Sequence, residues 1–190
     1  MNRSINTRRI ALAALFTAAS LILSFIQIPI FPAAPYLMYD PSGIVCLLAA
    51  MAFGPSLGAG VAVISWLPRV FLDPFGTIMG IISTLCFILP ASILYQKSGQ
   101  KRSASLVGMV LGAVLSIAAS CLMNLVITPL YAPGTTVAQV AAMIVPILIP
   151  FNLLKMVIHT AAGQLLLAPC VNVIESAHAG ANSTSSSARA

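Results

Sequence analysis

Six apolar segments, separated by short stretches that are polar or rich in proline and glycine, follow one another along the chain. Most of them approach the roughly 17 to 25 residues that a helix needs to cross a bilayer, and the alternating pattern of a transmembrane β-strand is absent. The pattern predicts an all-α membrane protein with a single domain over residues 1–175. The Ala/Ser-rich stretch 176–190 has no periodicity and is predicted to be a disordered tail. The apolar segments are 10–28, 43–53, 57–72, 77–95, 105–130 and 149–173.

Charged residues orient this bundle, since loops rich in Lys and Arg stay on the cytoplasmic side of a membrane. Residues 1–9 contain three arginines and residues 97–102 contain three basic residues, so both stretches are expected inside. An even number of crossings must separate them, which requires the short segment 43–53 to cross as well. We therefore predict a six-transmembrane-helix bundle with both termini cytoplasmic. Arg69 is the one basic residue near an outer end, and Asp73 is close enough in sequence to be its partner.

The first segment has two alternative explanations. A basic start followed by an apolar run also describes a signal peptide, and Arg8 with Arg9 suggests the twin-arginine kind. The run 10–28 is long enough to span and further spans follow it, which favours a transmembrane helix. Ala14 and Ala18 form a small-xxx-small pair that lets another helix approach closely, either inside the bundle or on a separate subunit.

Composition supports a membrane location. The 190 residues are 59% hydrophobic and 6% charged, with a mean hydropathy of +1.04, whereas about a quarter of the residues in a soluble domain are charged. The net charge of +6 does not indicate nucleic-acid binding, because the basic residues form no patch with aromatics. The four cysteines lie in different segments without metal-ligand spacing, so we expect them to pack in the core rather than bind metal or form disulfides.

The start of the last segment holds the most informative polar residues. Asn152 and Lys155 are three positions apart, so on a helix their side chains share one face, and Pro150 fits the first turn. An ionisable group inside a membrane segment indicates function by default. The alternative is a lysine that extends to the interface for solvation. His159, four residues further on, is expected to have a polar packing role rather than to relay protons.

The other polar groups are predicted to lie on the same, outer side of the membrane. With six crossings, Asn124 lies toward the outer end of its segment, as do Asn152 and Lys155, and Asp40 belongs to the outer loop 29–42. This loop is rich in prolines and aromatics, so it is stiff and suits either a lid over a flat ligand or an aromatic anchor at the interface. Buried amides discriminate strongly for a ligand that supplies their partners. The layout favours a binder of an external solute.

Several activities are disfavoured by what the sequence lacks. It contains no GxxxxGK[ST] phosphate loop, no HExxH, no GxSxG and no carboxylate pair, so a built-in ATPase or a metal or serine hydrolase is not indicated. A membrane enzyme that uses Lys155 or His159 would need a nucleophile and base pair, and none is present. Active transport by this chain alone would need ionisable groups within the membrane to carry protons or sodium ions, and the sequence has few of them. A self-sufficient facilitator remains an alternative.

Four stretches resemble a known family. They are residues 31–42, the Phe53-Gly54-Pro55 turn, residues 123–131 with Met-Asn-Leu and Pro-Leu-Tyr, and residues 149–155. In this order they resemble the substrate-binding S components of energy-coupling factor (ECF) vitamin transporters, and most closely the riboflavin-specific members of that family. The last of these motifs is fairly specific, whereas the alanine-rich first helix is shared across the wider family.

The resemblance implies a six-helix bundle in a prokaryotic plasma membrane, with riboflavin as the transported ligand near the outer face and no cofactor. It implies that this chain is not an enzyme and that ATP is hydrolysed by two cytoplasmic ATPases, which act through a transmembrane coupling subunit. The face of Ala14 and Ala18 would dock on that coupling subunit. The implied polar contacts to the flavin are Asn124, Asn152 and Lys155, and the implied residues of the covering loop are Leu37, Tyr39 and Asp40.

The chain departs from the family pattern at three places. Gly43 stands where the family usually has a second acidic residue, Ser65-Trp66-Leu67-Pro68 stands where a Lys-Asn pair is common, and the Asn-Phe pair often found near Gly80 is missing. Segments three and four therefore match poorly. The departures leave open a different vitamin or a flavin analogue as the ligand.

Overall fold

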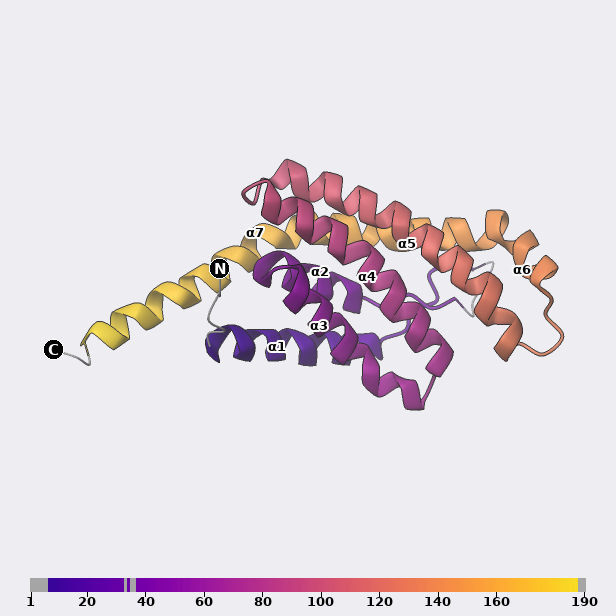
Figure 1. The fold of residues 1–190 in the computed structure, drawn as a ribbon, viewed down its shortest axis with the longest axis horizontal. Helices are drawn as coiled ribbons and strands as arrows, with labels where there is room; N and C mark the ends of the chain where they lie inside the picture. Colours follow the sequence, from indigo (N-terminus) through magenta and orange to yellow (C-terminus); the bar gives the residue numbers. More distant parts are fainter. Residues whose placement is uncertain (1–6, 33, 35–36, 188–190) are drawn as a thin grey trace.

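The computed structural model describes residues 7–32, 34 and 37–187, and it describes side chains as far as residue 172, except that of residue 8. Over this part the chain is nearly all helical and contains no named strand (Figure 1). Its elements are α1 (Thr7–Ser24), α2 (Ser42–Phe53), α3 (Pro55–Trp66), the 3-10 helix η1 (Leu67–Phe71), α4 (Pro74–Lys97), α5 (Arg102–Tyr131), α6 (Val137–Met143), the π-helix η2 (Ile144–Leu148) and α7 (Ile149–Ser187).

Each apolar segment of the sequence contains a helix. Three helical stretches are long and apolar enough to cross a membrane, namely Pro74–Lys97, Arg102–Tyr131 and Val137–Asn172, while Arg9–Ser24 and Ser42–Phe53 are shorter apolar helices. The all-α class is therefore confirmed, and the number of crossings and the side of the termini stay predictions. The sequence predicts a disordered tail from residue 176, whereas the helix α7 runs on to Ser187; the domain boundary at residue 175 stays a prediction.

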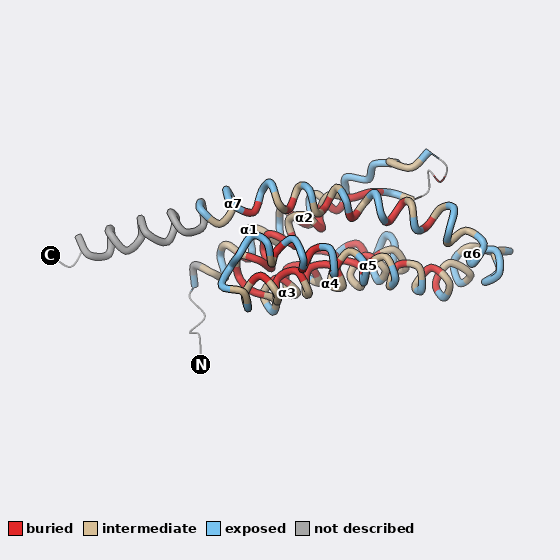
Figure 2. The backbone as a smooth tube through the Cα atoms, turned by 90° about the horizontal axis from the view of Figure 1, so that it is seen from above, coloured by how far each residue is buried: buried red, intermediate tan, exposed pale blue. Residues whose placement is uncertain are grey.

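The short helix α2 forms the centre of the bundle (Figure 2). It packs against α1, α3, α4 and α7, and nine of its residues, Ser42, Gly43, Cys46, Leu47, Leu48, Ala49, Ala50, Met51 and Phe53, are buried. A helix that is apolar on all sides is stable where other helices cover it. Gly54 ends it with a positive φ of 98°, and Pro55 begins α3 directly afterwards, so the chain reverses in one tight turn.

Helices α4 and α5 pack closely against each other through small residues. A Cβ atom at Gly112 would lie 2.2 Å from the carbonyl oxygen of Phe87, and one at Gly108 would lie 2.8 Å from the Cα of Ala91. Only glycine allows the two backbones to come this close.

The predicted core role of the cysteines holds best for Cys46, which is buried beside Ser20 and Ser65. The other three cysteines are half-buried, and none of the four forms a disulfide.

Candidate ligand-binding site

One end of the bundle encloses a cavity of about 430 Å³. It lies where η1 leads into α4, where α5 ends and where α7 begins, and the loop after α1 covers it. Its lining combines apolar and polar side chains. They are Gln27, Leu37, Met38, Asp40, Trp66, Arg69, Asp73, Gly76, Met79, Gly80, Ser83, Ser120, Asn124, Tyr131, Phe151, Asn152 and Lys155. Five of the six predicted ligand-binding residues, all except Tyr39, line this one cavity.

The α7 wall carries the amide and the ammonium that the sequence places on one face. Asn152 is buried and donates from Nδ2 to the carbonyl oxygen of Leu148 at 2.8 Å, within the preceding π-helix. Lys155 extends across to Asp40, with 3.5 Å between Nζ and Oδ2. The lysine side chain is only 13% exposed, so it forms a largely buried ion pair with Asp40 and does not extend to the interface for solvation.

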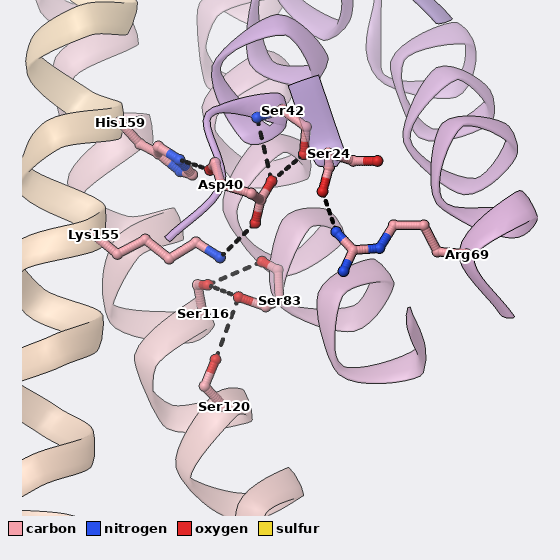
Figure 3. A network of polar contacts seen from close by, with 9 residues as sticks. All are labelled: Ser24, Asp40, Ser42, Arg69, Ser83, Ser116, Ser120, Lys155 and His159. Atoms are coloured by element: carbon pink, nitrogen blue, oxygen red, sulfur yellow. Dashed lines mark hydrogen bonds and ion pairs between the residues drawn. The ribbon is translucent and has the colours of Figure 1, made fainter. Parts of the chain in front are cut away.

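Asp40 links the covering loop to two helices (Figure 3). Its Oδ1 accepts from the backbone N–H of Ser42 at 3.2 Å and from the Ser42 hydroxyl, at the first turn of α2. Its own carbonyl oxygen accepts from Nε2 of His159 at 3.3 Å. Burial raises the pKa of the Asp40 carboxyl, but the Lys155 ammonium, the Ser42 hydroxyl, His159 and Arg69 together bring this pKa below its ordinary value. The carboxylate is therefore charged at neutral pH.

Tyr39 holds the covering loop in place instead of lining the cavity. It pairs with Ile28 in an isolated antiparallel bridge, with N···O distances of 2.8 and 2.9 Å. Its ring is buried 5.4 Å from that of His159. Burial, and then the nearby Asp40 carboxylate, raise the pKa of Tyr39 to about 12. Tyr39 therefore helps to hold the loop that carries Asp40, and it does not itself line the cavity.

The α5 side of the cavity presents a ladder of amide and hydroxyl groups. Asn124 is buried; its Nδ2 donates to the Ser120 carbonyl oxygen at 2.8 Å, and its Oδ1 accepts from the Thr128 hydroxyl at 3.0 Å. The Ser120 hydroxyl donates to Ser83 at 3.3 Å, and Ser83 and Ser116 lie 2.7 Å apart, as Figure 3 shows. These two local bonds hold Asn124 in one orientation, and the residue lines the cavity.

The opposite wall contains two residues, Trp66 and Arg69, that the sequence did not place among the ligand-binding residues. Trp66 and Arg69 are both buried and both line the cavity. The Arg69 guanidinium lies 5.0 Å from the Trp66 ring centroid and donates to the carbonyl oxygen of Ser24 at the end of α1. The expected pairing with Asp73 does not occur among the described residues, since that carboxylate caps α4 by accepting from Gly76 N–H at 2.8 Å. An arginine inside an apolar segment was the available signal.

In the regions where the chain departs from the family pattern, two glycines make room for bulky side chains from other helices. A Cβ atom at position 43 would lie 2.5 Å from Cε1 of His159, so His159 fills the space beside Gly43. A Cβ atom at position 80 would lie 2.5 Å from the Trp66 ring, so Trp66 needs Gly80. Both glycines are therefore required by bulky partners that the sequence alone does not connect to them.

Ala14 and Ala18 lie on α1 away from the cavity. Both are exposed, whereas Ala13 and Ser20 on the same helix are buried. The alternative that this small-residue pair serves packing inside the bundle is thus wrong for the described part of the chain. Docking of another subunit on this face stays a prediction.

Comparison with known proteins gives concordant matches. Residues 8–162 match the family described as "ECF transporter, substrate-specific component". The chain is 30% identical over 183 residues to the riboflavin transporter RibU of Staphylococcus aureus (strain TCH60), covering 92% of this chain and 96% of that protein. It is 25% identical over 187 residues to the riboflavin transporter FmnP of Bacillus subtilis (strain 168), covering 90% and 97%.

A solved structure has the same fold. It is described as "Structure and mechanism of the S component of a bacterial ECF transporter" and superposes with a TM-score of 0.74 at 26% sequence identity. The match covers 88% of this chain and 97% of the other. The shared architecture therefore extends over the helices that form the cavity.

Proposed function

The chain belongs to the substrate-specific components of ECF transporters, and on that premise we propose that it captures riboflavin in the cavity under the covering loop. The observation that carries this proposal is the convergence of Asn124, Asn152 and the Lys155–Asp40 pair on one cavity. The relatives named as riboflavin transporters support the choice of ligand.

The cavity suits a flat ligand with polar groups along one edge. A flavin ring has an apolar body and an edge of carbonyl oxygens and ring nitrogens, one of which carries a proton. Leu37, Met79 and Phe151 supply apolar surface, and the asparagines supply both donors and acceptors. The volume of about 430 Å³ lies within the range of about 300–1,000 Å³ that small-molecule sites occupy.

The covering loop closes the site from outside. The Ile28–Tyr39 bridge anchors it near α1, and Asp40 anchors it to Lys155 on α7. Because the same Lys155 faces the cavity, a bound ligand and the loop share this ammonium. Ligand binding and loop closure are therefore expected to strengthen each other.

Delivery requires partners, because the sequence has no phosphate-binding loop of its own. In this proposal the chain crosses the prokaryotic plasma membrane six times with both termini cytoplasmic. A transmembrane coupling subunit docks on the exposed Ala14 and Ala18 face, and two cytoplasmic ATPases supply the energy. The chain itself is a binding subunit without enzymatic activity.

Purification of the full chain in detergent from cells grown in rich medium tests the ligand. We expect bound flavin visible as a yellow colour and, after its removal, stoichiometric quenching of riboflavin fluorescence on titration, without added ATP. Thiamine and biotin serve as controls and should not compete. Absence of flavin binding, or tighter binding of another vitamin, would overturn the choice of riboflavin. Riboflavin flux into liposomes that contain this chain alone would favour a stand-alone facilitator instead.

A further inference from the structure

The α3–η1 wall of the cavity holds buried hydrogen-bond donors that lack protein partners. A guanidinium has five N–H donors, yet in the described structure Arg69 donates only to the Ser24 carbonyl oxygen, although the residue is just 8% exposed. The indole Nε1 of Trp66 is buried without any partner. Both residues line the cavity, and buried donors are normally satisfied, so a ligand there that brings acceptor atoms close would give these N–H groups partners.

This donor wall lies across the cavity from the asparagine and lysine wall. Arg69 comes from η1 and Trp66 from α3, while Asn152 and Lys155 come from α7. Among the described elements, α7 contacts neither α3 nor η1. Figure 3 accordingly shows Lys155 and Arg69 reaching in from opposite sides of Asp40. A ligand that fills the cavity therefore meets two separate polar sites.

The two sites differ in the chemistry that they accept. The flavin ring edge includes an N–H, which needs an acceptor, and Asn124 and Asn152 bear acceptor oxygens that Arg and Trp side chains lack. A polyhydroxylated chain offers several hydroxyl oxygens that accept from Arg69 and Trp66. Its own O–H groups find an acceptor in Asp73, which lies on the same side of the cavity. Because this second site combines the cation Arg69 with the anion Asp73, it offers both donors and acceptors and suits a neutral polyol.

We infer that Arg69 and Trp66 form a subsite for the hydroxylated chain of the ligand, and that this subsite makes the protein select flavins that carry such a chain. The inference rests on the proposed function. It assigns a binding role to the region where this chain departs from the family pattern, at Ser65-Trp66-Leu67-Pro68 and the arginine that follows.

The test compares riboflavin with lumiflavin, which has the same ring but a methyl group in place of the hydroxylated chain. In the purified full chain, Arg69→Gln should weaken riboflavin binding by about tenfold or more, as expected for loss of a charged hydrogen bond. Trp66→Phe should weaken it by about two- to tenfold. Lumiflavin affinity should change little in either variant. Arg102→Gln, which changes an exposed arginine near Gln164, is the matched control and should leave both affinities unchanged.

The outcomes separate the subsite from the proposed function and from a purely structural role. Equal losses for riboflavin and lumiflavin, or no loss in either variant, would overturn the subsite while riboflavin capture stands. Failure of the unaltered chain to bind riboflavin would overturn the proposed function itself. If Arg69→Gln lowers the melting temperature because the bond to Ser24 is lost, Trp66→Phe decides the question, since it removes the indole N–H and leaves the Arg69–Ser24 bond in place.

Discussion

At the scale of single residues, the pair between Lys155 and Asp40 is the most consequential contact. Asp40 is buried and Lys155 is largely buried, at 7% and 13% exposure of their side chains, and 115 positions separate them in sequence. Loss of one partner from a buried pair leaves a charge without compensation, which costs about 3–5 kcal/mol. The pair therefore contributes to closing the covering loop as well as to the polarity of the cavity.

Lys155→Met tests this contact, because methionine keeps the apolar stem and removes the charge and the donors. We expect riboflavin binding to weaken by about 1–3 kcal/mol, since a ligand acceptor and the Asp40 carboxylate both lose a partner. Fluorescence titration measures the loss. The double change with Asp40→Asn should weaken binding by less than the sum of the single effects.

Lys97→Met, near the polar turn between α4 and α5, is the control and should bind as the unaltered chain does. Undiminished affinity in Lys155→Met would show that this lysine contributes only to packing. The assignment of the α7 wall to ligand binding would then be wrong.

At the scale of elements, α1 has two different faces. One face packs inward through Ala13, Ser20 and Ser24, and Ser20 bonds Ser65 of α3 at 3.0 Å. The other presents Ala14 and Ala18 to the surroundings. In a membrane, small residues on an exposed face allow another helix to approach closely without gaining from hydrophobic burial. The face proposed for docking is therefore a different one from the face that packs inside the bundle.

Ala14→Leu and Ala18→Leu should reduce assembly with the coupling subunit several-fold, because each added side chain holds the partner helix away. Riboflavin binding by the isolated chain should be unchanged, since neither residue lines the cavity. Co-purification with the coupling subunit and flavin titration measure the two properties. Ala161→Leu, at an exposed position of α7, is the matched control. Joint loss of assembly and binding would mean that the face supports the fold instead.

At the scale of the whole molecule, the two ends of the bundle carry different polar groups. Arg9 donates to the Phe53 carbonyl oxygen at 2.7 Å, and Gln96 donates to that of Met51, also at 2.7 Å. Arg9 and the polar turn that follows Gln96 therefore lie at the same end of the bundle, beside the last turn of α2. The cavity with Asp40 lies at the other end, which supports the proposed orientation with the cavity outside.

Cysteine labelling tests this orientation. In a background free of native cysteines, Gln100→Cys should stay unlabelled by an impermeant thiol reagent in intact cells, and Thr135→Cys should be labelled. The physical reason is the positive-inside rule, which keeps residues 97–102 in the cytoplasm. A membrane-permeant reagent provides the control and should label both. Labelling at position 100 from outside would reverse or break the proposed topology.

The sequence by itself determined the class, the places of the helices and most of the polar groups of the site. The reason is that a bilayer leaves no backbone N–H or C=O unpaired, so apolar length translates directly into helices. Isolated polar residues within such segments, like Asn124, Asn152 and Lys155, are costly enough to be recognised without a structure.

Only the tertiary structure decided how those helices turn and which partners meet. The 3-10 helix η1 breaks the helical periodicity, so Arg69 is buried while Phe71 and Leu72 are exposed. The pairing of Lys155 with Asp40, the position of Tyr39 behind it, and the fit of Trp66 to Gly80 all join residues from different elements. Helix rotation and close packing determine such contacts, and neither is encoded in the hydrophobic pattern of a single segment.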